Sequence, residues 1–218
     1  MGDGNLKASM QIILETAQRA RAALFGPPDV HEYAADEAPL RLELFSAEQM
    51  QQHGKTLAGW HTLGAERAPD QLLSRLAENE RVLLHVRNLV AEAVQTNRRI
   101  TPAGEWLLDN FYLIEEQIRM AKRHLPKGYS RELPRLSNGP SAGLPRVYDI
   151  ALEIISHGDG RVDPESLGSF VASYQTVTDL KLGELWAIPI MIRLALIENL
   201  RRAGARIASD RIDRNRAH

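Results

Sequence analysis

The chain has no cysteine among its 218 residues. Disulfide bonds, a thiolate nucleophile and a zinc–sulfur site are therefore excluded, and a reducing compartment is compatible with the sequence. The chain also lacks a surplus of either charge, because 27 Lys and Arg stand against 28 Asp and Glu, which gives a net charge of −1. A general nucleic-acid-binding protein needs an excess of basic side chains to displace counterions, so no nucleic-acid partner is predicted.

Long apolar runs and short catalytic motifs are absent as well. The uncharged stretch 185–192 is far shorter than the ~20 residues that a membrane-spanning helix needs, and no apolar run of signal-peptide length precedes Glu15. No His-x-x-x-His or His-Glu-x-x-His pattern occurs, so no metal site is predicted, and the glycines of residues 157–160 are interpreted as a helix stop. A glycine-rich phosphate loop and a Gly-x-Ser-x-Gly elbow are also missing. No cofactor is therefore expected.

What the sequence does contain is a set of helical patterns. Apolar residues at alternating steps of four and three form one stripe through residues 101–125. The members of this stripe are Leu107, Phe111, Ile114, Ile118, Ala121 and Leu125. Thr101 supplies an N-cap and Pro102 a first-turn proline for this helix. The same rhythm, with caps at Ser46 and Asp163, predicts further helices over residues 9–24, 46–63, 69–97, 146–156, 163–174 and 182–202.

These patterns predict an all-α fold of six to eight helices in an orthogonal or bundle-like array. Helices 69–97, 102–125 and 182–202 are expected at its centre. A core cluster is expected to contain Trp106, Phe111, Trp186 and Ile190. Residues 126–145 hold four prolines and three glycines, a long loop that is either functional or poorly ordered. We expect weakly tethered N-terminal helices and a connector over 1–64, a main helical domain over 65–205, and an arginine-rich tail over 206–218.

A row of polar residues offers the main candidate for a functional site. Glu105, Asp109, Tyr112 and Glu116 repeat at helical spacing along one face. One interpretation is structural, with ion pairs that join Asp109 and Glu116 to Arg131, Arg135, Arg201 or Arg202. The other is catalytic, with an acid/base pair of the glycosidase kind drawn from Asp109, Glu115 and Glu116. Acids on one straight helix rarely frame a substrate from two sides, so the structural interpretation is favoured.

The last predicted helix is the most apolar segment, yet it carries four polar residues. Because polar groups on such a helix must find partners, we expect them to form internal hydrogen bonds. They are Glu184, Arg193, Glu198 and Asn199.

Three long segments carry a resemblance to a known family. They read WLLDNFYLIEEQIRMAKRHLPKGYSRELPRL, RVYDIALEIISHGDGRVD and GELWAIPIMIRLALIENLRR. In this order, over residues 102–202, they resemble the N-terminal region of the bacterial cyclic β-1,2-glucan synthases. Members of that family are very large inner-membrane proteins that build β-1,2-glucan from UDP-glucose, join its ends, and adjust its length through a phosphorylase-like C-terminal domain. In them the helical region precedes the membrane-embedded glycosyltransferase.

The resemblance implies an accessory or scaffolding N-terminal domain, cytoplasmic and at the inner face of the inner membrane, whose partner is the remainder of the synthase. The chain contains no Asp-x-Asp and no Gln-x-x-Arg-Trp, so no catalytic residue is carried across from the family. The surface expected to contact the rest of the enzyme consists of Lys127, Tyr129, Arg131 and Glu132. The alternative for these residues is a loop that is merely pinned to the acidic helix.

Two other functions stay open at this point. In one, the domain binds or processes β-1,2-glucan through Asp109, Glu115 and Glu116, with Trp106 and Tyr112 stacked on sugar rings. In the other, the chain is an unrelated helical protein that binds a partner.

Overall fold

The structure is a computed structural model that describes residues 40, 43–64, 69–125 and 127–216. Within these residues the chain forms seven α-helices and a short 3-10 helix, and the only β-type pairings there are two isolated bridges. The all-α prediction is confirmed. The predicted helix over residues 9–24 lies outside the described part of the chain.

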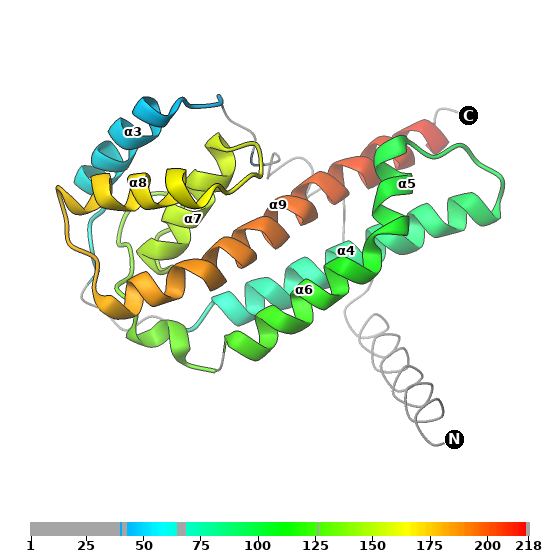
Figure 1. The fold of residues 1–218 in the computed structure, drawn as a ribbon. Coiled ribbons are helices and arrows are strands. Elements are labelled where there is room, and N and C mark those ends of the chain that lie inside the picture. The colour runs from blue at the N-terminus through cyan, green and yellow to red at the C-terminus, as the bar shows by residue number, and fades with distance from the viewer. Residues whose placement is uncertain (1–39, 41–42, 65–68, 126, 217–218) are drawn as a thin grey trace, which may run out of the picture.

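Three long helices form the centre of the fold. They are α4 (Leu72–Gln95), α6 (Phe111–His124) and α9 (Leu182–Arg216), which contact one another and run side by side in Figure 1. The apolar stripe predicted for residues 101–125 faces their common interface, because all six of its members are buried. Burial of this stripe supplies much of the apolar area that drives the helices together.

The segment predicted as one helix over 102–125 is in fact two helices, which corrects that expectation. α5 (Pro102–Asp109) ends at Asn110, and α6 begins directly after it. The Asn110 side chain donates from Nδ2 to the Trp106 carbonyl at 2.8 Å, and its backbone N–H donates to the same carbonyl. An asparagine side chain that competes for backbone acceptors in this way favours a helix end. α5 therefore turns across the ends of α4 and α9 (Figure 1).

The remaining helices form the other end of the molecule. α3 (Ala47–Trp60) packs against α8 (Pro164–Gln175), and α7 (Arg146–His157) packs against α9 (Figure 1). The capping box predicted at the start of α3 is present, since Ser46 Oγ accepts from the Gln49 N–H and Gln49 Oε1 accepts from the Ser46 N–H. Buried residues of α3 and α7 belong to the same apolar core as those of α4, α6 and α9. The division into domains at 64 and 205 stays a prediction.

The expected aromatic core cluster is half wrong. Phe111 and Ile190 are buried, but Trp106 and Trp186 are 53% and 74% exposed. The buried face of α9 runs through Glu184, Ala187 and Met191, and residue 186 points to the opposite side of the helix at this spacing. α9 continues without a break through Pro189, whose side chain lies on the exposed side. Among the described helices, none combines the length and apolar character that crossing a membrane requires.

The proline-rich loop has a defined structure. It contains the 3-10 helix η1 (Tyr129–Glu132), and its glycines at 128, 139 and 143 take positive φ angles of 85°, 74° and 84°. Asp70, two residues before α4, accepts hydrogen bonds from the Gly128 N–H and the Ser130 hydroxyl. Arg135, 6% exposed, donates from Nη1 to the carbonyls of Pro69 and Gly143 at 2.9 and 2.8 Å. The loop is thus pinned to the segment just before α4.

Candidate functional site

A pocket of about 550 Å³ lies between the end of α3, one face of α7 and the loop around residue 140. Polar side chains from five segments reach its wall, and the exposed indole of Trp60 stands at its edge. A pocket of this size with a few convergent polar groups is typical of a small-ligand site. Its polar lining residues are His61, Arg75, Asn138, Ser141, Asp149, Glu153, Ser156 and Arg202.

One wall of this pocket holds a hydrogen-bonded chain of three side chains. His61 Nε2 lies 3.0 Å from an Asp149 oxygen, and His61 Nδ1 lies 2.8 Å from the Tyr174 hydroxyl. Because a carboxylate only accepts, Nε2 carries the proton toward Asp149 and Nδ1 accepts from the tyrosine. Tyr174 is fully buried, and burial raises its pKa. These hydrogen bonds therefore orient His61, and the buried phenol of Tyr174 is not exposed to a substrate.

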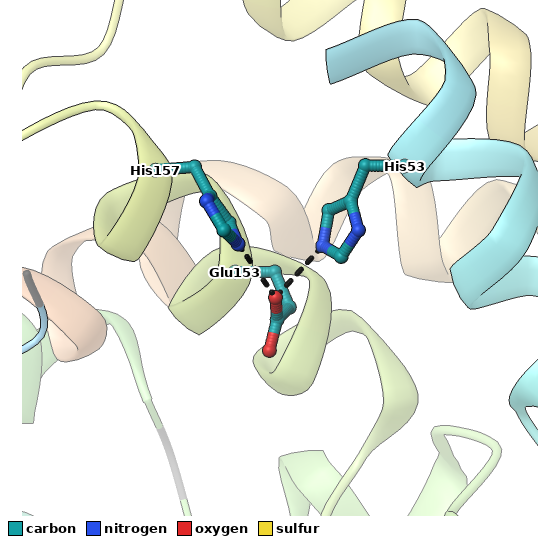
Figure 2. A group of neighbouring side chains, drawn as sticks. All are labelled: His53, Glu153 and His157. Atoms are coloured by element: carbon teal, nitrogen blue, oxygen red, sulfur yellow. Dashed lines mark hydrogen bonds and ion pairs between the residues drawn. The ribbon is translucent and has the colours of Figure 1, made fainter. Parts of the chain in front are cut away.

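A second cluster lies beside the pocket and shares Glu153 with it. Figure 2 shows the rings of His53, from α3, and His157, from α7, both turned toward one oxygen of Glu153. His53 Nε2 is 2.8 Å and His157 Nε2 is 3.5 Å from Oε2 of Glu153. The ligand atoms of the three side chains all lie within 4.8 Å of one another, close enough to share one metal ion.

Two buried glutamates on α9, Glu184 and Glu198, hold the helices together. Glu198 is fully buried and accepts hydrogen bonds from Arg75 of α4 at 2.6 and 3.0 Å and from Asn79 at 2.9 Å. Arg201 and Arg202, on α9 itself, also donate to Glu198, at 2.8 and 3.1 Å. We call these five residues the Glu198 cluster. Of the polar residues predicted to bond internally, Glu184 and Glu198 do so, and Asn199 accepts from the Leu40 N–H.

The charges in the Glu198 cluster shift the pKa values of its neighbours. Burial alone would lower the pKa of Arg75, but the Glu198 carboxylate more than offsets this, and that pKa lies above its usual value. Burial, together with repulsion from Arg202, lowers the pKa of Arg201 to about 10, so this guanidinium stays charged at neutral pH. Burial, and then the charge of Glu198, raises the pKa of the nearby Tyr148 phenol.

Glu184, at the start of α9, forms a second buried ion pair. Arg146, at the start of α7, donates from Nε and Nη2 to the two oxygens of Glu184 at 2.6 and 2.7 Å. Both side chains are at most 2% exposed. Glu184 also accepts from the backbone N–H of Lys181 at 2.9 Å and so caps its own helix.

The acids singled out from the sequence lie elsewhere. Asp109 belongs to α5 and is exposed, while Glu115 and Glu116 belong to α6, beyond the break at Asn110. Within the described residues, neither Asp109 nor Glu116 forms an ion pair, so the structure does not join them to the loop arginines. Arg201 and Arg202 form ion pairs with Glu198, and Arg135 bonds to backbone carbonyls. Lys127, Arg131 and Glu132 are exposed on η1 and beside it, and Tyr129 is half-buried.

Sequence reasoning missed the pocket and the two-histidine cluster. Glu153 and His157 are four residues apart on one helix face, which is a usable signal for paired ligands. Their partner His53 lies 100 residues from Glu153 in the sequence, so only the fold reveals it.

Sequence comparison relates most of this chain to a region of a large carbohydrate synthase. No protein-family model matches the chain. Over 180 residues, or 82% of its length, it is 36% identical to the cyclic β-(1,2)-glucan synthase NdvB of Rhizobium meliloti strain 1021. The chain spans only 6% of the length of that protein. The related region extends beyond residues 102–202, which carried the resemblance in the sequence.

Proposed function

We propose that this helical unit is an accessory, non-catalytic part of a cyclic β-1,2-glucan synthase, at the cytoplasmic face of the inner membrane. The observation that carries the proposal is the 36% identity to NdvB, which extends over 82% of this chain. The matching region is only 6% of NdvB, so it is a small part of that protein. In this role the unit packs against the rest of an enzyme that transfers glucose from UDP-glucose to a growing glucan.

The buried charges support a structural role. Glu184 and Glu198, the two least exposed acids among the described residues, are each held by guanidinium groups and have no access to a substrate. The exposed acids Asp109 and Glu116 belong to α5 and α6, on either side of a helix break, and neither lines the pocket beside Trp60.

The contact surface that we propose is the tip of the proline-rich loop, made of Lys127, Tyr129, Arg131 and Glu132. Its charged side chains are exposed, while the backbone beneath them is fixed by Asp70 and by the buried Arg135. A surface that is already rigid loses little conformational entropy when a partner binds. With two cations, Lys127 and Arg131, against the single carboxylate of Glu132, the tip suits a mostly acidic partner surface.

Reversing the charge at the loop tip should impair the synthase. In a chimera in which this chain replaces the matching region of NdvB, Lys127→Glu with Arg131→Glu should lower the rate of glucan formation about tenfold or more, the effect of losing an interface hot spot. The matched control is Arg119→Glu with Arg123→Glu, two exposed arginines on α6, which should change the rate little. A normal rate in the loop variant, or a large fall in the melting temperature of the isolated chain, would refute the contact surface.

A second candidate function is binding of a β-1,2-glucan segment in the pocket beside Trp60. The observation that favours it is an exposed indole next to hydrogen-bonding groups such as Asn138 and Asp149, because sugars stack on aromatic faces and bond through hydroxyls. If this is correct, β-1,2-gluco-oligosaccharides should bind the purified chain with a Kd of about 1 mM or tighter by calorimetry.

Trp60→Ala should then weaken glucan binding about tenfold, whereas Trp186→Ala should leave it unchanged. The two tryptophans are a matched pair, since each is 74% exposed and only Trp60 borders the pocket. Equal effects of the two substitutions, or no measurable heat of binding at millimolar oligosaccharide, would refute glucan binding in this pocket. Neither result would bear on the proposed accessory role.

A further inference from the structure

We propose that His53, Glu153 and His157 bind one divalent transition-metal ion, with Zn²⁺ the best fit. The proposal is independent of the role in glucan synthesis. It rests on the distances between the ligand atoms, on the hydrogen bond that orients His157, and on the types of ligand present.

The three ligand atoms have the spacing of a metal site. Zinc bonds of about 2.0–2.1 Å at tetrahedral angles place neighbouring ligand atoms about 3.3 Å apart. Oε2 of Glu153 is 2.8 Å from His53 Nε2 and 3.5 Å from His157 Nε2, which brackets that value. All three ligand atoms lie within 4.8 Å of one another, so side-chain rotations could gather them around one ion, and both rings already point at the carboxylate (Figure 2).

The orientation of His157 suits a cation in this place. Its Nδ1 lies 2.8 Å from the carbonyl oxygen of Glu43, and because a carbonyl only accepts, Nδ1 carries the proton. In the neutral ring, Nε2 then directs a lone pair toward the carboxylate of Glu153. Two acceptors face each other unless a proton or a metal ion lies between them. A backbone carbonyl that fixes the second nitrogen of a histidine is the usual support of a metal-binding imidazole.

Other neighbours hold the cluster in shape. The ring of Phe45 stacks on His157 with centroids 3.7 Å apart and meets the edge of His53 at 5.4 Å. His157 is 7% exposed, and His53 and Glu153 are 22% and 27% exposed. The ligands are thus largely shielded, yet an ion can reach them from solvent.

The ligand types select the ion. Two imidazole nitrogens and one carboxylate oxygen suit Zn²⁺, Co²⁺ or Ni²⁺ better than Mg²⁺ or Ca²⁺, which prefer all-oxygen sites. Three protein ligands leave a fourth position for water or another ligand. Because His53 comes from α3 and the other two from α7, the ion would join these helices beside the pocket, to which Glu153 belongs.

The test is a titration of the full chain, stripped of metal with a chelator, with Zn²⁺ at pH 7.5 in a calorimeter. We expect one equivalent to bind, and Co²⁺ to give the visible absorption of a tetrahedral site. At a zinc concentration of about 100 Kd the melting temperature should rise by about 5–10 °C. Lowering the pH to 5.5 should weaken binding, because imidazole must be deprotonated to bind metal.

His53→Ala and Glu153→Gln should each weaken zinc binding about 100-fold, more than the loss of an outer hydrogen-bond partner does. The matched control is His124→Ala, an exposed histidine on α6, which should bind zinc as the parent does. His53→Gln serves as a second variant if His53→Ala proves unstable by circular dichroism. No zinc binding at about 100 μM, or equal binding by the parent and the His53 and Glu153 variants, would overturn the proposal.

Discussion

Replacing Glu198 by alanine is expected to lower the free energy of unfolding by about 3–5 kcal/mol, the usual cost of removing one member of a buried ion pair. The substitution leaves Arg75, Asn79, Arg201 and Arg202 without their shared acceptor. Three positive charges would then face one another near the interface of α4 and α9, where Arg201 is only 2% exposed. Urea denaturation followed by circular dichroism measures the change.

The control for this experiment is Glu92→Ala, an exposed glutamate on α4, which should change stability by no more than about 0.5 kcal/mol. Glu198→Gln is informative as well, because the amide keeps the shape of the side chain and loses its charge. It should cost less than alanine but still destabilise the chain. A cost below about 1 kcal/mol for Glu198→Ala would contradict the structural role of the Glu198 cluster.

Arg146→Met should also destabilise the chain by about 3–5 kcal/mol, because it leaves the carboxylate of Glu184 buried without its cation. The same substitution removes the bond from Arg146 to the Asp179 carbonyl, which ties the start of α7 to the segment before α9. The measurement is again the midpoint of urea denaturation, with the slope compared between variants.

The double variant Arg146→Met with Glu184→Leu separates charge from packing. Two apolar side chains of similar volume leave no unpaired charge, so the double variant should be more stable than Arg146→Met alone. It should stay about 1 kcal/mol below the parent, because Glu184 also caps α9 through the Lys181 N–H. A double variant as unstable as the sum of the two single variants would show that the pair is not coupled.

The helices were predictable because their signals are local. Six apolar residues between Leu107 and Leu125 keep helical spacing, and all six are buried. The apolar residues keep the same helical spacing on both sides of Asn110. The apolar pattern therefore does not reveal the break between α5 and α6. That break depends on the Asn110 side chain, which competes for the Trp106 carbonyl. The spacing of apolar residues contains no information about such a bond.

The role of the polar residues on α9 was also predictable, whereas their partners were not. Glu184 and Glu198 lie on a mostly apolar helix, so buried hydrogen bonds could be inferred without coordinates. Their partners Arg146 and Arg75 lie 38 and 123 residues away in the sequence. The same limit applies to the cluster of His53, Glu153 and His157, since the first residue belongs to α3 and the other two to α7, about 100 residues later.

The exposed tryptophans show the opposite limit. Trp106 and Trp186 were expected in the core because tryptophan is large and mostly apolar. Their positions on the helix surface place both side chains toward solvent instead. In each case the residue two positions earlier is buried, Gly104 before Trp106 and Glu184 before Trp186, while the tryptophan itself faces solvent. A large side chain therefore does not identify the core unless its position on the helix face is also taken into account.

The most direct test of the accessory role is the rate of cyclic β-1,2-glucan formation from UDP-glucose in membranes that carry one of three proteins. These are NdvB, NdvB without the region that this chain matches, and the chimera in which this chain replaces that region. We predict that the deletion abolishes synthesis and that the chimera restores it. Full synthesis by the deletion protein, or an inactive chimera that is made and inserted at normal levels, would contradict the account.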